Sequence, residues 1–138
     1  MTRLIALITR CVVLIAGLTV TSLHAEVIDI DSPRLQELIE QGVVVIDVRR
    51  AEEWSATGII EGSELMTFFD AQGRYDAVQW LDEVKKQVDT EAPVILICHS
   101  GVRSSIISKW LGKQIDTVYN VKDGIVAWKK DQRPTVAP

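Results

Sequence analysis

The chain has 138 residues, 47% of them hydrophobic and 25% charged, and its 15 basic and 19 acidic residues give a net charge of −4. This length suits a single domain with one ordinary core. The acidic balance leaves no basic patch for nucleic acid or for an anionic membrane surface, so neither partner is expected.

The first 25 residues have the three-part pattern of a secretory signal peptide. Arg3 and Arg10 give a positive start, an apolar run follows from Cys11 to Val20, and TSLHA ends in the small residue Ala25. We expect cleavage after Ala25 and export to the periplasm or the outside of a bacterial cell, with no membrane attachment afterwards. An uncleaved anchor is the alternative, although the run is shorter than the roughly 18 to 20 residues of a spanning helix.

Cleavage there would leave residues 26–138 as a single domain, with 13 basic residues once Arg3 and Arg10 are removed from the 15, and all 19 acidic ones. Cys98 and His99 would be its only cysteine and its only histidine. An internal disulfide is then impossible, and two soft side chains are too few for a zinc-type metal site. No bound metal is expected.

Strand and helix patterns alternate along this domain. EVIDID, residues 26–31, alternates like a short strand, and a helix capped by Ser32 follows and ends at Gly42. VVVI, residues 43–46, is apolar on both faces, which suits a strand between two layers of helix. The later predicted elements are a helix over 51–57, a strand near 63–66, a helix over 76–88, a strand over 94–97, a helix over 103–111, a strand over 117–121 and a helix over 125–130.

This alternation predicts an α/β fold, in which helices cover both faces of a mainly parallel five-stranded sheet. Apolar spacing indicates the inner faces of two of the helices. These positions are Val78, Leu81, Val84 and Val88 in the first, and Ile106, Ile107, Trp110 and Leu111 in the second. The tail DQRPTVAP, after Lys130, is expected to be loose.

The stretch CHSGVRS begins where the apolar strand 94–97 ends. Ligands of open α/β sheets bind at the carboxyl ends of the strands. Gly101 permits a tight turn, and the N-terminus of the next helix adds partial positive charge, so backbone N–H groups can stabilise a thiolate at Cys98. Arg103 would add to this field or brace the loop. The alternative is that Cys98 is an inert, buried apolar residue.

Four separated motifs resemble the rhodanese family of sulfurtransferases and occur in the family's order. CHSGVRS, residues 98–104, is similar to its active-site loop Cys-x-x-Gly-x-Arg-Ser. VIDVR at 45–49, EEW at 52–54 and GIVAW at 124–128 are similar to its strand end, its acid-plus-aromatic step and its last helix. One departure follows Gly58, where the family commonly has His-Ile-Pro-Gly-Ala and this chain has IIEGS.

The resemblance covers about residues 28–130 and implies the three-layer rhodanese fold, with sulfur transfer through a persulfide. Cys98 would be the catalytic nucleophile, attacking the outer sulfur of thiosulfate or a similar donor and passing it to a thiol or to cyanide. No metal or organic cofactor is implied. The substrate-binding residues would be His99, Ser100, Gly101, Val102, Arg103 and Ser104.

Asp47 and Arg49 are assigned to support of this site. A carboxylate at a strand end can accept loop N–H groups, and the neighbouring arginine can pair with Glu52 or Glu53.

Two other functions remain open. Cysteine phosphatases and arsenate reductases place five residues between nucleophile and arginine, whereas only four, 99–102, separate Cys98 from Arg103 here. The shorter loop makes a tighter cup, better suited to one sulfur than to a full oxyanion. A non-catalytic or regulatory rhodanese module that binds a partner or a sulfur species is the second alternative. Such modules often lack the cysteine, and this chain has it.

Overall fold

The computed structural model describes residues 26–138. The predicted signal peptide falls on residues 1–25 and lies outside this range. Among the described residues, no helix is both long enough and apolar enough to cross a membrane.

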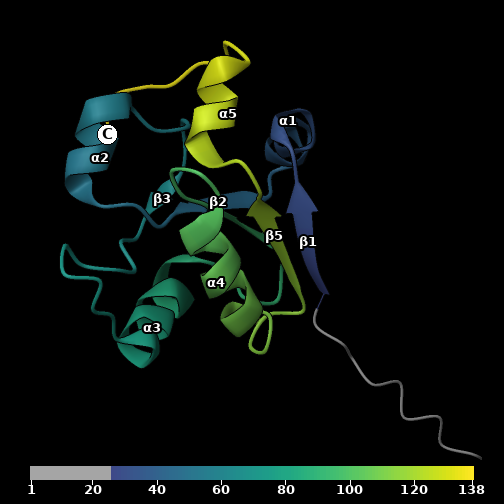
Figure 1. Cartoon of the computed structure of the whole chain (residues 1–138). Helices are drawn as coiled ribbons and strands as arrows, with labels where there is room; N and C mark the ends of the chain where they lie inside the picture. The colour runs from purple at the N-terminus through teal and green to yellow at the C-terminus, as the bar shows by residue number, and fades with distance from the viewer. Residues whose placement is uncertain (1–25) are drawn as a thin grey trace, which may run out of the picture.

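Strands and helices alternate through the described range, as predicted. The strands form one sheet in the order β1-β5-β4-β2-β3, and every neighbouring pair is parallel (Figure 1). The elements are β1 (Glu26–Ile30), α1 (Ser32–Glu40), β2 (Val44–Asp47), α2 (Ala51–Thr57), β3 (Glu64–Leu65), α3 (Ala77–Gln87), β4 (Val94–Ile97), α4 (Val102–Leu111), β5 (Thr117–Val121) and α5 (Gly124–Lys130). The predicted α/β fold is confirmed.

Helices cover both faces of the sheet, with α1 and α5 on one side and α3 and α4 on the other (Figure 1). The central strand β4 contributes to both cores. Val94 and Leu96 pack in the cluster that contains α3 and α4, whereas Ile95 and Ile97 pack in the cluster that contains α1 and α5. All four side chains are buried, and β4 is the middle strand of the sheet. The residues that follow its carboxyl end therefore begin at the centre of one edge of the sheet.

Aspartates cap two of the helices. The Asp31 carboxylate accepts from the Arg34 N–H at 3.0 Å, and that of Asp76 accepts from the Gln79 N–H at 3.0 Å. Ser32 was predicted as the cap of α1 but is its first helical residue. Asp31 replaces it because a carboxylate at this position reaches the free N–H groups of the first turn.

The inner face of α3 differs from the prediction at one position. Val78, in the first turn, is 71% exposed, whereas Trp80 is buried and donates from Nε1 to the Met66 carbonyl at 3.0 Å. The large indole fills the space under the first turn, so Val78 lies on the outer face.

The inner face of α4 also differs. Ile106 is 57% exposed, although it was predicted to face the core beside Ile107, which is buried. Ser104 and Ser108 are fully buried on the same helix. Their small side chains let α4 lie close to the sheet, and the helix then turns Ile106 outward.

The prediction of a loose C-terminal tail was wrong. Ile59 and Val136 exchange two backbone hydrogen bonds of 2.9 Å. Trp128 donates from Nε1 to the Pro134 carbonyl at 2.8 Å, and the Arg133 guanidinium lies 5.3 Å from the centre of the same indole. These contacts hold the tail along α5 and the turn after α2.

Candidate active site

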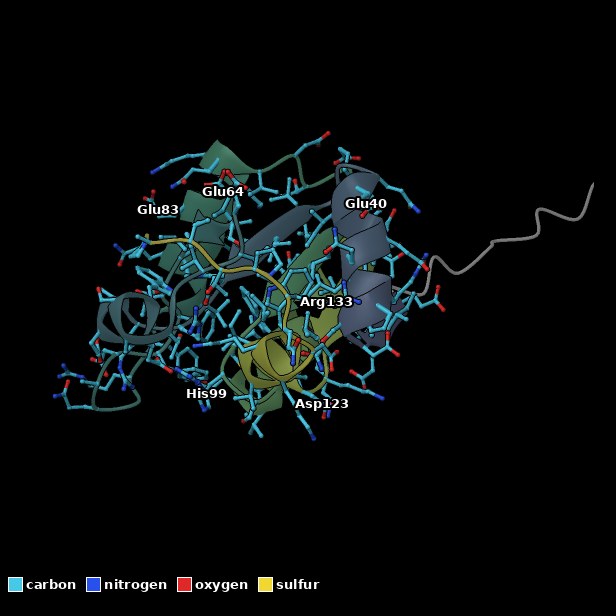
Figure 2. The ribbon with its side chains drawn as sticks, turned by 90° about the horizontal axis from the view of Figure 1, so that it is seen from above. Glu40, Glu64, Glu83, His99, Asp123 and Arg133 are labelled. Carbon is cyan, nitrogen blue, oxygen red and sulfur yellow. The ribbon has the colours of Figure 1, made fainter. Side chains whose placement is uncertain are left out.

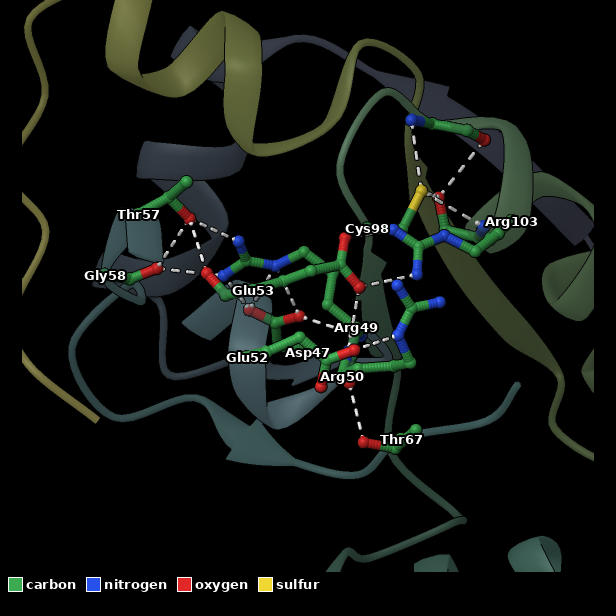
Figure 3. A network of polar contacts seen from close by, with 12 residues as sticks. Asp47, Arg49, Arg50, Glu52, Glu53, Thr57, Gly58, Thr67, Cys98 and Arg103 are labelled. Atoms are coloured by element: carbon green, nitrogen blue, oxygen red, sulfur yellow. Dashed lines mark hydrogen bonds and ion pairs between the residues drawn. The ribbon is translucent and has the colours of Figure 1, made fainter. Parts of the chain in front are cut away.

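The Cys98 side chain lies in a ring of hydrogen-bond donors at the carboxyl end of β4 (Figure 3). Its Sγ accepts from the Gly101 N–H at 3.1 Å, from the Ser104 N–H at 3.4 Å and from the Ser104 hydroxyl at 3.3 Å. The residue is 1% exposed. Three donors directed at one sulfur can stabilise the negative charge that develops on it during a reaction.

The first turn of α5 holds this loop from the other side. The Ile125 N–H donates to the Cys98 carbonyl at 2.9 Å, and the Val126 N–H donates to the His99 carbonyl at 3.2 Å. Figure 2 shows His99 and Asp123 on the same side of the molecule. A Cβ at Gly124 would lie 2.3 Å from the His99 carbonyl oxygen, so glycine is required for this contact.

Gly101 is expected to be as intolerant of a side chain. Its φ is +89°, and a Cβ there would lie 1.8 Å from the Lys122 carbonyl oxygen. Gly101→Ala should therefore lower the free energy of unfolding by about 3 kcal/mol and slow any reaction of Cys98. Urea denaturation measures the first effect.

Gly73→Ala is the matched control for this substitution. Gly73 has a similar φ of +75°, but nothing lies within 4 Å of the position of its Cβ. The free energy of unfolding of Gly73→Ala should fall only by the cost of placing alanine in the left-handed conformation, about 1 kcal/mol. Equal losses in the two variants would show that the contact with Lys122 is unimportant.

An ion pair joins the cysteine loop, residues 98–104, to α2 (Figure 3). Arg103 donates from Nη1 to Glu53 Oε2 at 2.9 Å and from Nη2 to Glu53 Oε1 at 2.6 Å. The hydrogen bond from Arg103 is the main cause that lowers the pKa of Glu53 from 4.5 to about 2, and the same bond raises the pKa of Arg103. The structure thus shows Arg103 bracing the loop, one of the two roles expected for it.

This pair should make stability depend on acid. Because the pKa of Glu53 falls from 4.5 in the unfolded chain to about 2 in the fold, the unfolded state binds the proton more tightly. The contribution of the pair is complete above about pH 5 and is lost as the pH falls from 4.5 towards 2. In urea denaturation, the free energy of unfolding of wild type should exceed that of Glu53→Gln by the largest amount above pH 5. This difference should shrink as the pH falls. Arg103→Gln should show the same trend. A difference constant with pH would contradict it.

A second, fully buried ion pair lies beneath α2. The Asp47 carboxylate accepts from Arg49 Nη2 at 2.7 Å, from Nε at 2.9 Å and from the backbone N–H at 3.1 Å. Arg49 also donates to Thr57 Oγ1 at 2.6 Å and to the Gly58 carbonyl at 2.9 Å. Arg49 thereby fixes the end of α2.

The predicted partner of Arg49 was wrong. It pairs with Asp47, whereas Glu52 pairs with Arg50 and Glu53 pairs with Arg103. A fully buried guanidinium needs a carboxylate that is buried with it, and the two glutamates of α2 lie nearer the surface.

A hollow of about 480 Å³ lies between α2 and the cysteine loop. Its lining residues are Glu52, Glu53, Ala56 and Thr57 on the first side, and His99, Ser100, Val102 and Arg103 on the second. Four of the six predicted substrate-binding residues thus face this hollow, and the other two, Gly101 and Ser104, contact the sulfur. Asp47 and Arg49 lie outside the lining and support it.

Sequence reasoning did not identify α2 as a wall of this site. Glu52 and Glu53 were recognised as part of a motif and as possible partners of Arg49, and Ala56 and Thr57 were not singled out. Their distance along the chain from residues 99–103 gives no signal that they lie opposite these residues in space.

Solved structures share this fold. A rhodanese-related protein from Thermoplasma volcanium is 25% identical, with a TM-score of 0.63, over 80% of this chain and 99% of that one. The polysulfide-sulfur transferase homodimer from Wolinella succinogenes is 21% identical, with a TM-score of 0.63, over 83% of this chain and 81% of that one.

Curated relatives match at the level of sequence. The thiosulfate sulfurtransferase GlpE of Actinobacillus pleuropneumoniae serotype 3 (strain JL03) is 34% identical over 100 residues, 71% of this chain and 82% of that protein. The putative sulfurtransferase YtwF of Bacillus subtilis (strain 168) is 30% identical over 111 residues, 79% of this chain and 97% of that protein. Residues 31–131 match the family described as the rhodanese-like domain, and the chain belongs to that family.

Proposed function

We propose that this protein is a sulfurtransferase that carries a sulfane sulfur as a persulfide on Cys98. It takes the sulfur from thiosulfate or a similar donor and passes it to a thiol or to cyanide. The observation that supports this most is the ring of three donors around the Cys98 sulfur. The printed names of two relatives, the thiosulfate sulfurtransferase GlpE and the putative sulfurtransferase YtwF, agree with it.

The first half of the reaction loads the cysteine. The Cys98 thiolate attacks the outer sulfur of thiosulfate, a new S–S bond forms, and the old S–S bond breaks so that sulfite leaves with its electron pair. The Gly101 N–H and the N–H and hydroxyl of Ser104 stabilise the negative charge on sulfur during this step.

The second half restores the enzyme. An acceptor thiolate or cyanide attacks the outer sulfur of the persulfide, and the Cys98 thiolate leaves. No oxidant or reductant is consumed, and the residues described here need no metal or organic cofactor for either half.

Mass spectrometry of the purified protein after treatment with thiosulfate tests this proposal. One added sulfur should appear on Cys98, and cyanide should remove it with formation of thiocyanate. The same preparation should hydrolyse an aryl phosphate more slowly than it consumes thiosulfate, because only four residues separate Cys98 from Arg103. Absence of the added sulfur with thiosulfate and with other sulfane donors would favour the regulatory module, and faster phosphate hydrolysis would favour a phosphatase.

We propose further that the chain is exported and that residues 1–25 are removed. The positively charged start, the short apolar run and Ala25 support this. N-terminal sequencing of the protein from its native host should give Glu26 as the first residue, in the periplasmic or secreted fraction. Retention of Met1 in a membrane fraction would support the uncleaved anchor.

A further inference from the structure

The charged groups of the hollow over the cysteine loop are already engaged with one another. Among its lining residues the one arginine is Arg103, and both of its terminal nitrogens donate to Glu53. Glu52 pairs with Arg50, which is not in the lining. Thr57 donates its hydroxyl to the Glu53 carbonyl. Within the described chain, this wall therefore offers a ligand two carboxylates and no uncommitted arginine or lysine.

The remaining surface of the hollow is largely apolar. Ala56 lies in the wall from α2, and Val102 lies in the wall from α4 and is 66% exposed. An organic group placed between them would lose contact with water, which is favourable. His99 and Ser100 complete the polar part of the lining.

Thiosulfate fits this wall poorly. It is a dianion, and the three oxygens of its sulfonate end lose their hydration when they enter a site. That loss is costly unless donors or opposite charges replace the water. Two backbone donors of the loop, those of Gly101 and Ser104, are directed at the Cys98 sulfur, and the guanidinium that could receive the sulfonate is held by Glu53.

We infer that this site loads Cys98 from an organic hydropersulfide, R–S–SH, in preference to thiosulfate, and that Glu53 sets this preference by engaging Arg103. The inference rests on the proposed persulfide function and specifies its donor. The group R lies between Ala56 and Val102. Glu53 determines specificity because its ion pair with Arg103 leaves the guanidinium unavailable to an anionic donor.

The transfer step is balanced without any further reactant. The Cys98 thiolate attacks the outer sulfur of R–S–SH, and a new S–S bond forms between them as the S–S bond of the donor breaks. The electron pair leaves with the thiolate RS⁻, which then takes a proton from water. The transferred sulfur keeps its proton and its oxidation state, so Cys98–S–SH forms with no change in redox balance.

Single-turnover loading of Cys98, followed by mass spectrometry, tests this inference with two donors. The probes are thiosulfate and the hydropersulfide of 2-mercaptoethanol. Wild type should load from the hydropersulfide at least about tenfold faster. Glu53→Gln keeps the size of the side chain but releases the Arg103 charge, so it should raise the rate with thiosulfate by about tenfold, equivalent to about 1.4 kcal/mol. Its rate with the hydropersulfide should change by less than about threefold.

Glu37→Gln is the matched control, because Glu37 pairs with Arg34 on α1, outside the lining of the hollow, and its loss leaves the pair between Glu53 and Arg103 in place. It should raise the thiosulfate rate by less than about threefold. Adding Arg103→Gln to Glu53→Gln should cancel the gain.

Three results would overturn the inference while the proposed function stands. They are faster loading of wild type from thiosulfate, equal gains in the two glutamine variants, and slower loading of Glu53→Gln from both donors, which would leave Glu53 as a structural brace only. Failure of both donors to load wild-type Cys98 is a different result, and it would contradict the proposed function itself.

Discussion

Cys98→Ser should abolish sulfur transfer while leaving the fold in place. The serine hydroxyl is close in size to the thiol, and the donors of Gly101 and Ser104 can still reach its oxygen. A hydroxyl in this position forms no persulfide, so the rate of transfer should fall at least about a thousandfold. The free energy of unfolding should change by no more than about 1 kcal/mol. Thiocyanate formation and urea denaturation measure the two effects on the same protein.

Ser105→Ala is the control for this experiment. Ser105 lies one residue beyond Ser104 on α4 and makes no hydrogen bond to the Cys98 sulfur. Its loss should leave transfer within about threefold of wild type. Transfer that survives in Cys98→Ser would mean that the sulfur is carried elsewhere or that Cys98 is an inert core residue.

Asp47→Ala should be the most destabilising of the substitutions considered. Asp47 and Arg49 are both 0% exposed, and the guanidinium would lose its buried counter-charge. Arginine cannot escape by losing its proton, so the cost should be about 3 to 5 kcal/mol. That is a large part of the roughly 5 to 15 kcal/mol that holds a typical domain together. The urea midpoint should fall accordingly.

The double variant Asp47→Ala with Arg49→Met separates the lost ion pair from the lost packing. Methionine fills part of the arginine site without a charge, so the double variant should be more stable than Asp47→Ala alone. The double variant should transfer sulfur more slowly than wild type, because Thr57 and Gly58 lose the donors that fix the end of α2. If the double variant is less stable than Asp47→Ala, the charge of Arg49 must have another buried partner.

Local patterns predicted the parts of this site that follow one another in the chain. The apolar run of β4, the cysteine at its end and Gly101 three residues later are neighbours in sequence, and the general rule for parallel sheets then places Cys98 at the opening. The donors around the sulfur come from the same short loop. Residues that are close together in this part of the sequence are therefore also close together in the site.

Contacts between distant elements could not be predicted in this way. Glu53 and Arg103 are 50 residues apart, and they meet only because β2 and β4 are neighbours in the sheet and carry α2 and the cysteine loop to the same edge. Arg49 was assigned the wrong partner for a related reason. Its burial, which decides the pairing, depends on how α2 covers the strand end.

The hold of α5 on the cysteine loop has a consequence for the order in which the protein forms. Ribosomes deliver the chain from its N-terminus, and the groups that clamp the Cys98 and His99 carbonyls belong to Ile125 and Val126. The edge strand β1 likewise waits for β5, because Asp29 pairs with Asn120, 91 residues later. Contacts between such distant positions form late and slow the folding of a small domain. The thiol is therefore synthesised before its surroundings, and a nascent chain carries it without the donor ring that encloses it in the fold.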